Sequence, residues 1–575
     1  MKIKINKNKL IILVSLFLVL SVLSSCSQED LGLPVSNTET REENEQNGNS
    51  LSEEELFLEM KAKQDKNPLK DINIRKAILH AVDRKSIVDE IFNGYNDISN
   101  SLFAEGSPFW DPAWAEYDYD LSVAGEYLSK AGYGPDNPLY ITIRAVNNSA
   151  SKQLIENIIR QDLEKIGINL WIYNDPPKEF YQNHVYSGTF DLGLWSLYVF
   201  GGNELQCSFS SDKIPPMETE ENTDCENFYW YSNTEVDNQL RQIAGIEDLE
   251  GKKEKITELQ EVLAKDAVLL PLYSRLFVFA YDASLRSIEL DVMEDRVYFN
   301  IEEWALPSGL EVQEGEKTEI NIGYESDNVD IFNGFEPYFI NDLLFKGLWK
   351  KNQDGSFSSE MVEENPEILK DEEMAMYSNS VFIRLRDDIF WHDGDPIISE
   401  DVEYTFEYLR EFMEDRQYFS NIDQDLKKIQ DIDIVDDKSF NIVFDEYIDD
   451  WQKLFPMIFK KDYFSNGNYD NLQYGRIISN GPYKVIKYDS EGELVLEINE
   501  YYYNDIPEIE RLIIKFDPDI HNLIAMLKEG EINFLSIPVD PELMKILEDE
   551  NDMSLAIKKG NLVEHLALSL KPKEE

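Results

Sequence analysis

The strongest constraint on the fold is a short polar stretch, Pro307–Lys317, that interrupts an otherwise continuous alternation of helix and strand patterns. Before it, the helical spacing of Ser151–Ile166 is followed by the strand-like alternation of Ile168–Tyr173. After it, a helix pattern at Glu400–Arg416 is followed by a strand pattern at Ser439–Phe444. A chain of 575 residues also exceeds what one hydrophobic core holds. The sequence therefore predicts an α/β protein of two or three domains, with a linker at residues 307–317.

A pair of short helices is predicted at Ile72–Tyr95. Apolar residues at helical spacing form the first helix, and Asp83–Ser86 interrupts the pattern before a second helix begins. Gly94 suits the left-handed conformation that ends many helices. Ordinary core packing explains this pattern, so we assign the segment no ligand contact.

The first residues have the layout of an export signal. Lysines at positions 2, 4, 7 and 9 precede an apolar stretch, Leu10–Leu23, that is too short for a comfortable membrane span. Residues 23–26 read Leu-Ser-Ser-Cys, which resembles the lipobox of bacterial lipoproteins. By that resemblance residues 1–26 form the signal peptide and Cys26 is lipidated; cleavage of a plain secretory peptide nearby is the alternative. The polar residues 27–52 predict an acidic, flexible tether, and the rest is expected outside the cytoplasm at the cell membrane.

The formal net charge of −59 excludes some partners. Nucleic acid needs a basic face, and anionic lipid headgroups also attract basic residues, so we expect no nucleic acid and no lipid binding by the folded part. Solubility or adaptation to a salty or acidic medium explains the charge. An acidic field that attracts cationic ligands is the other interpretation.

Only two cysteines remain after Cys26, namely Cys207 and Cys225. An exported protein meets an oxidising environment, so one disulfide between them is expected, with two free thiols as the alternative.

Motifs for catalysis, cofactors and metals are missing from the sequence. The five histidines are far apart, and none has a second His or a Cys at metal-ligand spacing. Nucleophile-elbow, phosphate-loop and dinucleotide motifs are also absent. We therefore expect a binding protein without metal or cofactor rather than an enzyme.

Aromatic residues are a better indication of function. Trp195, Tyr198 and Phe200 follow a predicted buried strand, and Tyr229 and Trp230 follow Asn227. Aromatic rings line many concave ligand sites, but they also fill cores, and both interpretations stay open here.

Several segments resemble the extracellular solute-binding proteins of family 5, which include binding lipoproteins of ABC importers for oligopeptides, dipeptides and nickel. The resemblance covers nearly all of residues 66–307 and 318–575. In the second half it rests on Trp391–Pro396, Ser399–Val402, Asn480–Tyr483, Asn499–Tyr502 and Leu527–Asn533. In the first half it rests on Ile74–Ile78, Val82–Arg84, Tyr119–Tyr133 and Leu270–Leu272.

The two halves stand in the reverse of the family's order, because the half containing Trp391 comes first in the family. The chain therefore resembles a circularly permuted member in which Leu566–Glu575 would continue into Asn67–Ile72. Two truncated copies fused tail to head, each completed by a neighbouring chain, are the alternative.

The resemblance implies an α/β fold of two lobes with a ligand between them, of the type II periplasmic-binding-protein kind, with an extra domain. Lobe two would comprise residues 53–270, lobe one 271–350 and 430–575, and the extra domain 351–429. The strands near Leu269–Tyr281 and Leu562–Leu570 would cross between the lobes.

The resemblance also implies capture of a peptide or similar organic solute and its delivery to an ABC permease, with attachment to the membrane through the N-terminal lipid. The acid that holds a peptide's amino terminus in the family is absent here, and Glu204 is the nearest. Strand-like pairing with the ligand is implied near Tyr324–Ser326 and Trp195–Tyr198. The expected ligand-binding residues are Trp195, Tyr198, Phe200, Glu204, Asn227, Tyr229, Trp230, Tyr324, Glu325 and Asn480. A surface lipoprotein for adhesion or peptide sensing is the alternative function.

Overall fold

The computed structural model describes most of the chain after the predicted tether. The described residues are 51–572 except 65, 200–202, 216–226, 247, 291–296, 299, 307–316, 327–341, 353–355, 365–369, 372–375, 378–379, 417–424, 446–447, 449–450, 466–476 and 489–491. Cys26, Phe200, Cys225, residues 1–50 and most of the linker lie outside this set.

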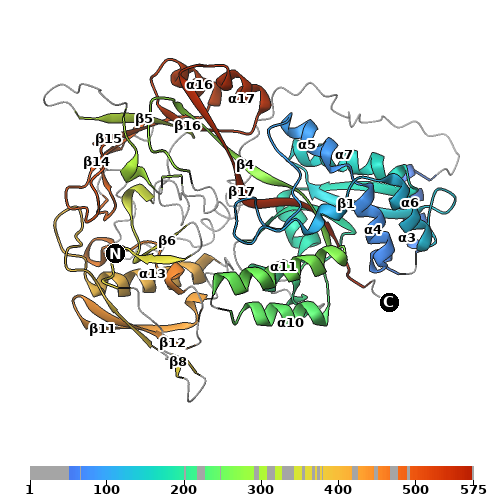
Figure 1. Ribbon diagram of the computed structural model, residues 1–575, viewed down its shortest axis with the longest axis horizontal. Helices are drawn as coiled ribbons and strands as arrows, with labels where there is room; N and C mark the ends of the chain where they lie inside the picture. Colours follow the sequence, from blue (N-terminus) through green and yellow to red (C-terminus); the bar gives the residue numbers. More distant parts are fainter. Residues whose placement is uncertain are drawn as a thin grey trace, which may run out of the picture.

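A ten-stranded sheet runs through the molecule in the order β13-β14-β15-β5-β16-β4-β17-β3-β1-β2. Its strands are β1 (Leu139–Val146), β2 (Ile168–Asp175), β3 (Leu192–Tyr198), β4 (Leu269–Asp282), β5 (Glu319–Glu325), β13 (Tyr483–Tyr488), β14 (Glu493–Ile498), β15 (Arg511–Asp517), β16 (Phe534–Ile537) and β17 (Met553–Leu568). The long pair β4–β17 lies between two groups of shorter strands (Figure 1).

One hydrophobic core holds residues from Leu69 to Leu276 together with Leu566–Leu570, and we call the part built around it lobe two. Its helical segments are α3 (Glu53–Ala62), η2 (Pro68–Lys70), α4 (Ile72–Ala81), α5 (Arg84–Phe92), η3 (Ala113–Glu116), α6 (Leu121–Lys130), α7 (Ala150–Glu164), α8 (Pro177–Glu179), the π-helix η4 (Phe180–Val185), α9 (Asn203–Phe209), η5 (Ser211–Lys213), α10 (Thr234–Ile243) and α11 (Leu249–Lys265). The helix pair predicted at Ile72–Tyr95 is confirmed. Asp71 and Asp83 cap its helices, and Asn93 and Gly94 adopt left-handed conformations at its end.

Two further cores lie on the other side of the β4–β17 pair, and we call the part around them lobe one. One core holds Phe279–Leu306, Ile320–Phe345 and Met457–Phe534; the other packs α16 and α17 against Val278, Ala280 and Leu535. The helical segments of lobe one are η6 (Ile301–Glu303), α15 (Lys461–Phe464), α16 (Ile520–Lys528) and α17 (Pro541–Glu548).

A fourth core holds residues from Leu348 to Ile458 and therefore extends beyond the predicted extra domain at 351–429. The cause is a three-stranded sheet in which β12 pairs with both β10 and β11. The elements of this part are β6 (Trp349–Lys351), β7 (Phe357–Ser359), β8 (Lys370–Asp371), β9 (Met376–Tyr377), β10 (Ser380–Arg384), α13 (Ser399–Arg416), β11 (Ile429–Asp436), β12 (Ser439–Phe444) and η7 (Trp451–Leu454).

The predicted crossing strands connect the lobes. β4 has almost its expected bounds, whereas β17 begins well before the expected Leu562, at Met553. β4 is one strand although Pro271 cannot donate a hydrogen bond, and the β4–β17 register shifts beside it, between Glu564 and His565. β17 likewise continues through Lys558–Asn561, a turn-like sequence, because a second register shift lies between Lys559 and Val563.

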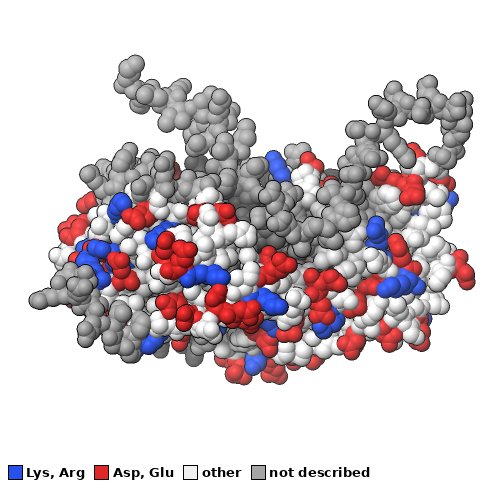
Figure 2. Space-filling model, turned by 90° about the horizontal axis from the view of Figure 1, so that it is seen from above, with Lys and Arg blue, Asp and Glu red and all other residues white. Residues whose placement is uncertain are grey.

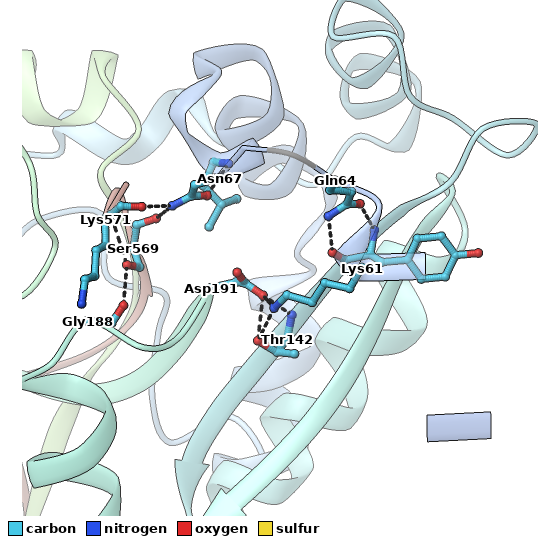
Figure 3. A network of polar contacts seen from close by, with 10 residues as sticks. Lys61, Gln64, Asn67, Thr142, Gly188, Asp191, Ser569 and Lys571 are labelled. Atoms are coloured by element: carbon cyan, nitrogen blue, oxygen red, sulfur yellow. Dashed lines mark hydrogen bonds and ion pairs between the residues drawn. The ribbon is translucent and has the colours of Figure 1, made fainter. Parts of the chain in front are cut away.

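The C-terminal segment lies against Asn67 (Figure 3). The Asn67 side-chain amide donates to the backbone carbonyls of Ser569 at 2.9 Å and Lys571 at 2.8 Å. The Lys571 ammonium donates to the Ser187 carbonyl at 2.7 Å and lies 4.8 Å from the ring centroid of Trp230. Asn67 and the C-terminal segment are thus adjacent and held together by hydrogen bonds.

Helix α3 and the residues after it fasten the start of the described chain to lobe two. Gln64 pairs with both the backbone N–H and the carbonyl of Tyr140, each at 2.9 Å. Lys61 forms an ion pair with Asp191, and the same carboxylate accepts from the backbone N–H and the hydroxyl of Thr142, both at 2.7 Å (Figure 3).

The two described flanks of the linker lie at one place on lobe one. The backbone N–H of Leu306 donates to the Glu508 carboxylate at 3.3 Å. The hydroxyl of Thr318 donates to the Glu508 carbonyl at 2.7 Å, and its backbone N–H donates to Glu510 at 3.1 Å. A short connection therefore suffices between these ends.

Candidate binding cavity in lobe two

A cavity of about 230 Å³ opens beside β3 in lobe two. Its walls come from η4, β3, α9 and the segment after residue 227. Five aromatic residues line it: Tyr181, Tyr186, Trp195, Phe228 and Tyr229. The other described lining residues are Val185, Ser196, Leu197, Cys207 and Ser208, so no charged side chain is found among the described residues of the wall.

Packed rings hold the aromatic wall in place. Trp195 meets Phe190 edge-on at 5.4 Å and His565 edge-on at 5.1 Å between ring centroids. Tyr186 stacks on Phe228 at 5.0 Å. Because these rings are fixed by one another, the cavity is formed before any ligand arrives.

His565 on β17 supports the cavity from behind. The Tyr229 hydroxyl lies 2.9 Å from Nε2 of this fully buried imidazole. Burial lowers the pKa of His565 to about 3, so the ring is neutral at physiological pH. The described side chains here do not form a Ser–His pair, because His565 contacts Tyr229 and the Ser196 hydroxyl bonds to Glu564.

A charged layer lies behind Ser196. The Lys152 ammonium on α7 is 3.2 Å from the Glu564 carboxylate, and these side chains are only 10% and 6% exposed. Ser196 donates its hydroxyl proton to the other oxygen of Glu564 at 2.8 Å. Burial lowers the pKa of Lys152, but the charge and hydrogen bond of Glu564, together with Tyr181 and Glu156, outweigh burial, and the net pKa is raised.

Glu156 lies one turn after Lys152 on α7 and is fully buried. Burial raises the pKa of its carboxyl group to about 8, and Asn174 and Lys152 offset this only in part. Lys152 therefore forms its ion pair with Glu564 and acts on Glu156 only through its electric field.

The structure separates the predicted ligand-binding residues into several places. Trp195 and Tyr229 line the cavity, whereas Tyr198 lies half-exposed at the end of β3. Trp230 is buried beside Lys571, and Glu204 lies on α9.

Tyr324 and Glu325 end β5 in lobe one and are therefore apart from the cavity. Burial raises the pKa of Glu325, and nearby Asp519 adds to this effect.

Asn227 and Asn480 have structural roles. Both are fully buried. The Asn227 amide donates to the carbonyls of Ser210 and Tyr231 at 3.0 and 2.7 Å. The Asn480 oxygen accepts from the Lys346 N–H at 3.0 Å, and its amide donates to the Lys346 carbonyl at 3.2 Å. Both side-chain amides are therefore engaged with the backbone.

Sequence reasoning missed other members of the site. Tyr181 lies in the π-helix η4 and Tyr186 directly follows it, and their five-residue spacing belongs to neither the α-helix nor the strand pattern. Lys152 and Glu564 carry no local signal of their pairing, because more than four hundred residues separate them.

Cys207 is disulfide-bonded. Its predicted partner, Cys225, lies outside the described residues, so the pairing stays a prediction.

Two other features are not found in the described part of the chain, namely a metal site and a membrane-spanning helix. There, no group of three or more His, Cys, Asp or Glu residues is arranged to hold a metal ion. None of the helices in that part combines the length and hydropathy needed to cross a membrane. On the face in Figure 2, both acidic and basic side chains are visible among the described residues.

Comparison with known proteins identifies the family. The family model described as "Bacterial extracellular solute-binding proteins, family 5 Middle" matches residues 30–204 and 366–574, which together exceed half of the chain. The chain belongs to this family, as its motifs predicted. Members of the family are binding proteins rather than enzymes and work outside the cytoplasm.

Individual relatives match over shorter regions. The nickel-binding periplasmic protein of Escherichia coli is 26% identical over 20% of this chain and 24% of its own length. The glutathione-binding protein GsiB of Salmonella typhimurium is 24% identical over 38% of this chain and 42% of its own. The matches therefore span less than half of these relatives.

Solved structures were compared as well. NikZ of Campylobacter jejuni, in complex with Ni(L-His), has a TM-score of 0.35 at 24% identity, covering 41% of this chain and 46% of NikZ. The oligopeptide-binding protein AppA of Bacillus subtilis, with a nonapeptide, has a TM-score of 0.34 at 17% identity, covering 41% and 47%. The family assignment rests on the sequence match.

Proposed function

We propose that this chain is a lipid-anchored solute-binding protein of an ABC importer that captures a peptide or similar organic solute between its lobes. The observation that carries the proposal is the preformed aromatic cavity beside the strands that connect the lobes. A solute that contacts both lobes favours the closed arrangement, because only that arrangement provides all its contacts.

The side of β3 next to the cavity supports a peptide-like ligand. β17 pairs with β3 along its whole length, whereas β1 pairs only with Leu192 and Gly193 of that strand. Among the described residues no further strand covers residues 194–197 on this side. An extended ligand can add its backbone at such an edge while one side chain enters the cavity.

Membrane attachment is proposed through Cys26, on the basis of the lipobox-like residues 23–26 and the apolar stretch before them. Delivery to a permease is proposed from the family membership and from the names of relatives such as the oligopeptide-binding protein AppA.

Circular permutation is proposed on three observations. The family match is split into two segments. Asn67 bonds to the C-terminal segment, and the flanks of the linker meet at Glu508 and Glu510. Both junctions therefore close within one chain, and we expect a compact monomer in sedimentation; an obligate dimer would instead mean that two chains exchange halves.

A peptide library tests the binding function. A ligand that binds only the folded state stabilises it by RT ln(1 + [L]/Kd), about 2.7 kcal/mol at a hundredfold excess over Kd. We expect members of the library to raise the Tm of the full chain. The proposal fails if no peptide or small organic solute pool shifts the Tm.

A further inference from the structure

We infer that the cavity takes an uncharged aromatic group that carries a hydrogen-bond donor, such as the indole or phenol of a peptide's Trp or Tyr residue. This inference deepens the proposed function and rests on it. The inference states which kind of ligand side chain enters the cavity, whereas the proposed function states only that a solute binds.

The absence of charge from the wall is the first argument. The chain is 29% charged, yet none of the ten lining residues that the structure describes carries a charged side chain. A charged ligand group would lose water there without gaining an opposite charge. Glu564 does not supply one, because it lies behind Ser196 and is paired with Lys152.

Shape and size are the second argument. A volume of about 230 Å³ is below the ~300–1,000 Å³ of sites that enclose a whole drug-sized ligand, so it suits one group of a larger solute. Trp195 and Tyr229 are tilted by 31° with centroids 6.0 Å apart, and Tyr186 and Phe228 stack nearby. A flat ring gains edge and face contacts from such walls.

The direction of one hydrogen bond is the third argument. A serine hydroxyl has a single proton, and Ser196 gives it to a carboxylate, which at neutral pH only accepts. The Ser196 oxygen can therefore only accept from a ligand. An N–H or O–H on the ring satisfies it, whereas a benzyl group does not.

Calorimetric titration of the full chain in detergent with N-acetyl amino-acid amides tests this inference. We expect the Tyr and Trp derivatives to bind, and the Phe derivative to bind about fivefold more weakly for the loss of one hydrogen bond. The Glu and Lys derivatives should bind at least about a hundredfold more weakly. Equal affinity for a charged derivative, or no binding of the Tyr and Trp derivatives, overturns the inference.

Variants sharpen the test. Ser196→Ala should bring the Tyr and Phe derivatives to equal affinity, whereas Ser129→Ala, at an exposed position on α6, should keep the difference. If Ser196→Ala does not fold, the titrations of the unaltered chain with the amino-acid derivatives still test the inference. Binding of library peptides that carry no aromatic residue, as tightly as those with Tyr or Trp, would refute the inference and leave the proposed function standing. Binding of the Tyr and Trp derivatives without any Tm shift from the peptide library would support the inference and contradict the proposed function.

Discussion

Two regions place a lysine beside a carboxylate but balance charge differently: the network around Asn67 that includes Lys61 and Asp191 (Figure 3), which we call the junction, and the charged layer behind the cavity. At the junction, Lys61 and Asp191 are 22% and 14% exposed, and Thr142 gives Asp191 two more hydrogen bonds. Behind the cavity, Lys152 forms an ion pair with Glu564 and also lies in the electric field of Glu156. The side chains of Lys152 and Glu564 are only 10% and 6% exposed.

The two regions differ in how well their carboxylates are stabilised in the charged form. A carboxylate with one lysine and further donors is stabilised by its surroundings, as at the junction. The buried carboxyl group of Glu156 has no lysine of its own, because Lys152 is paired with Glu564, so its charged form is destabilised. Such local costs gather at functional sites, which supports the assignment of the cavity as the site.

Replacement of Lys152 should give the largest effect. Lys152→Met leaves Glu564 charged and buried without its partner, so we expect a loss of about 3–5 kcal/mol in the free energy of unfolding, measured by urea denaturation. Lys61→Met is the matched control at the junction and should lose only about 1 kcal/mol, because Asp191 keeps Thr142 and some water. Equal losses would mean that the two regions do not differ.

Replacement of Glu156 should give an effect that depends on pH. A carboxyl group whose pKa rises on folding, here from 4.5 to about 8, holds its proton more tightly in the folded state. Its contribution to stability is therefore greatest below pH 4.5 and declines as the pH rises towards 8.

The Glu156→Gln variant should lack this decline and gain about 3 kcal/mol over the unaltered chain between pH 5 and pH 8. Denaturation at several pH values measures the difference. Glu126→Gln, at an exposed position on α6, is the control and should follow the unaltered chain. A constant difference between Glu156→Gln and the unaltered chain at all pH values would contradict the prediction.

Replacement of Asn67 should give the smallest of the three effects. Asn67→Ala removes two hydrogen bonds to the C-terminal segment and the cap of η2, so we expect a loss of about 2 kcal/mol. The exposed Asn137 makes a single 2.8 Å bond to the Gly132 carbonyl, and Asn137→Ala should lose less than about 1 kcal/mol. If Asn67→Ala costs no more than this control, the junction does not depend on these bonds.

Much of the fold was predictable because its signals are local. The helix pair at Ile72–Tyr95 follows from apolar spacing and from Asp residues placed to cap. The length of β17 was not predictable, because the register shift between Lys559 and Val563 depends on its pairing with β4, almost three hundred residues away.

The site was predictable only in part. Trp195 and Tyr229 stand out as aromatic residues near a strand, and both line the cavity. Asn227 and Asn480 are equally prominent in the sequence, but their amides bond to the backbone of their own loops and of a neighbouring segment. Whether a polar side chain faces a ligand or a loop depends on tertiary contacts that a single sequence does not contain.

Helix α3 has a mechanical consequence. Its Phe57 packs against Tyr140 and Trp171, and Lys61 and Gln64 bind the same part of lobe two. In the proposed membrane-anchored protein, tension on the chain before Glu53 would therefore be carried by lobe two. Lobe one, which is joined to lobe two through β4 and β17, would then be the part that moves when a solute is enclosed or released.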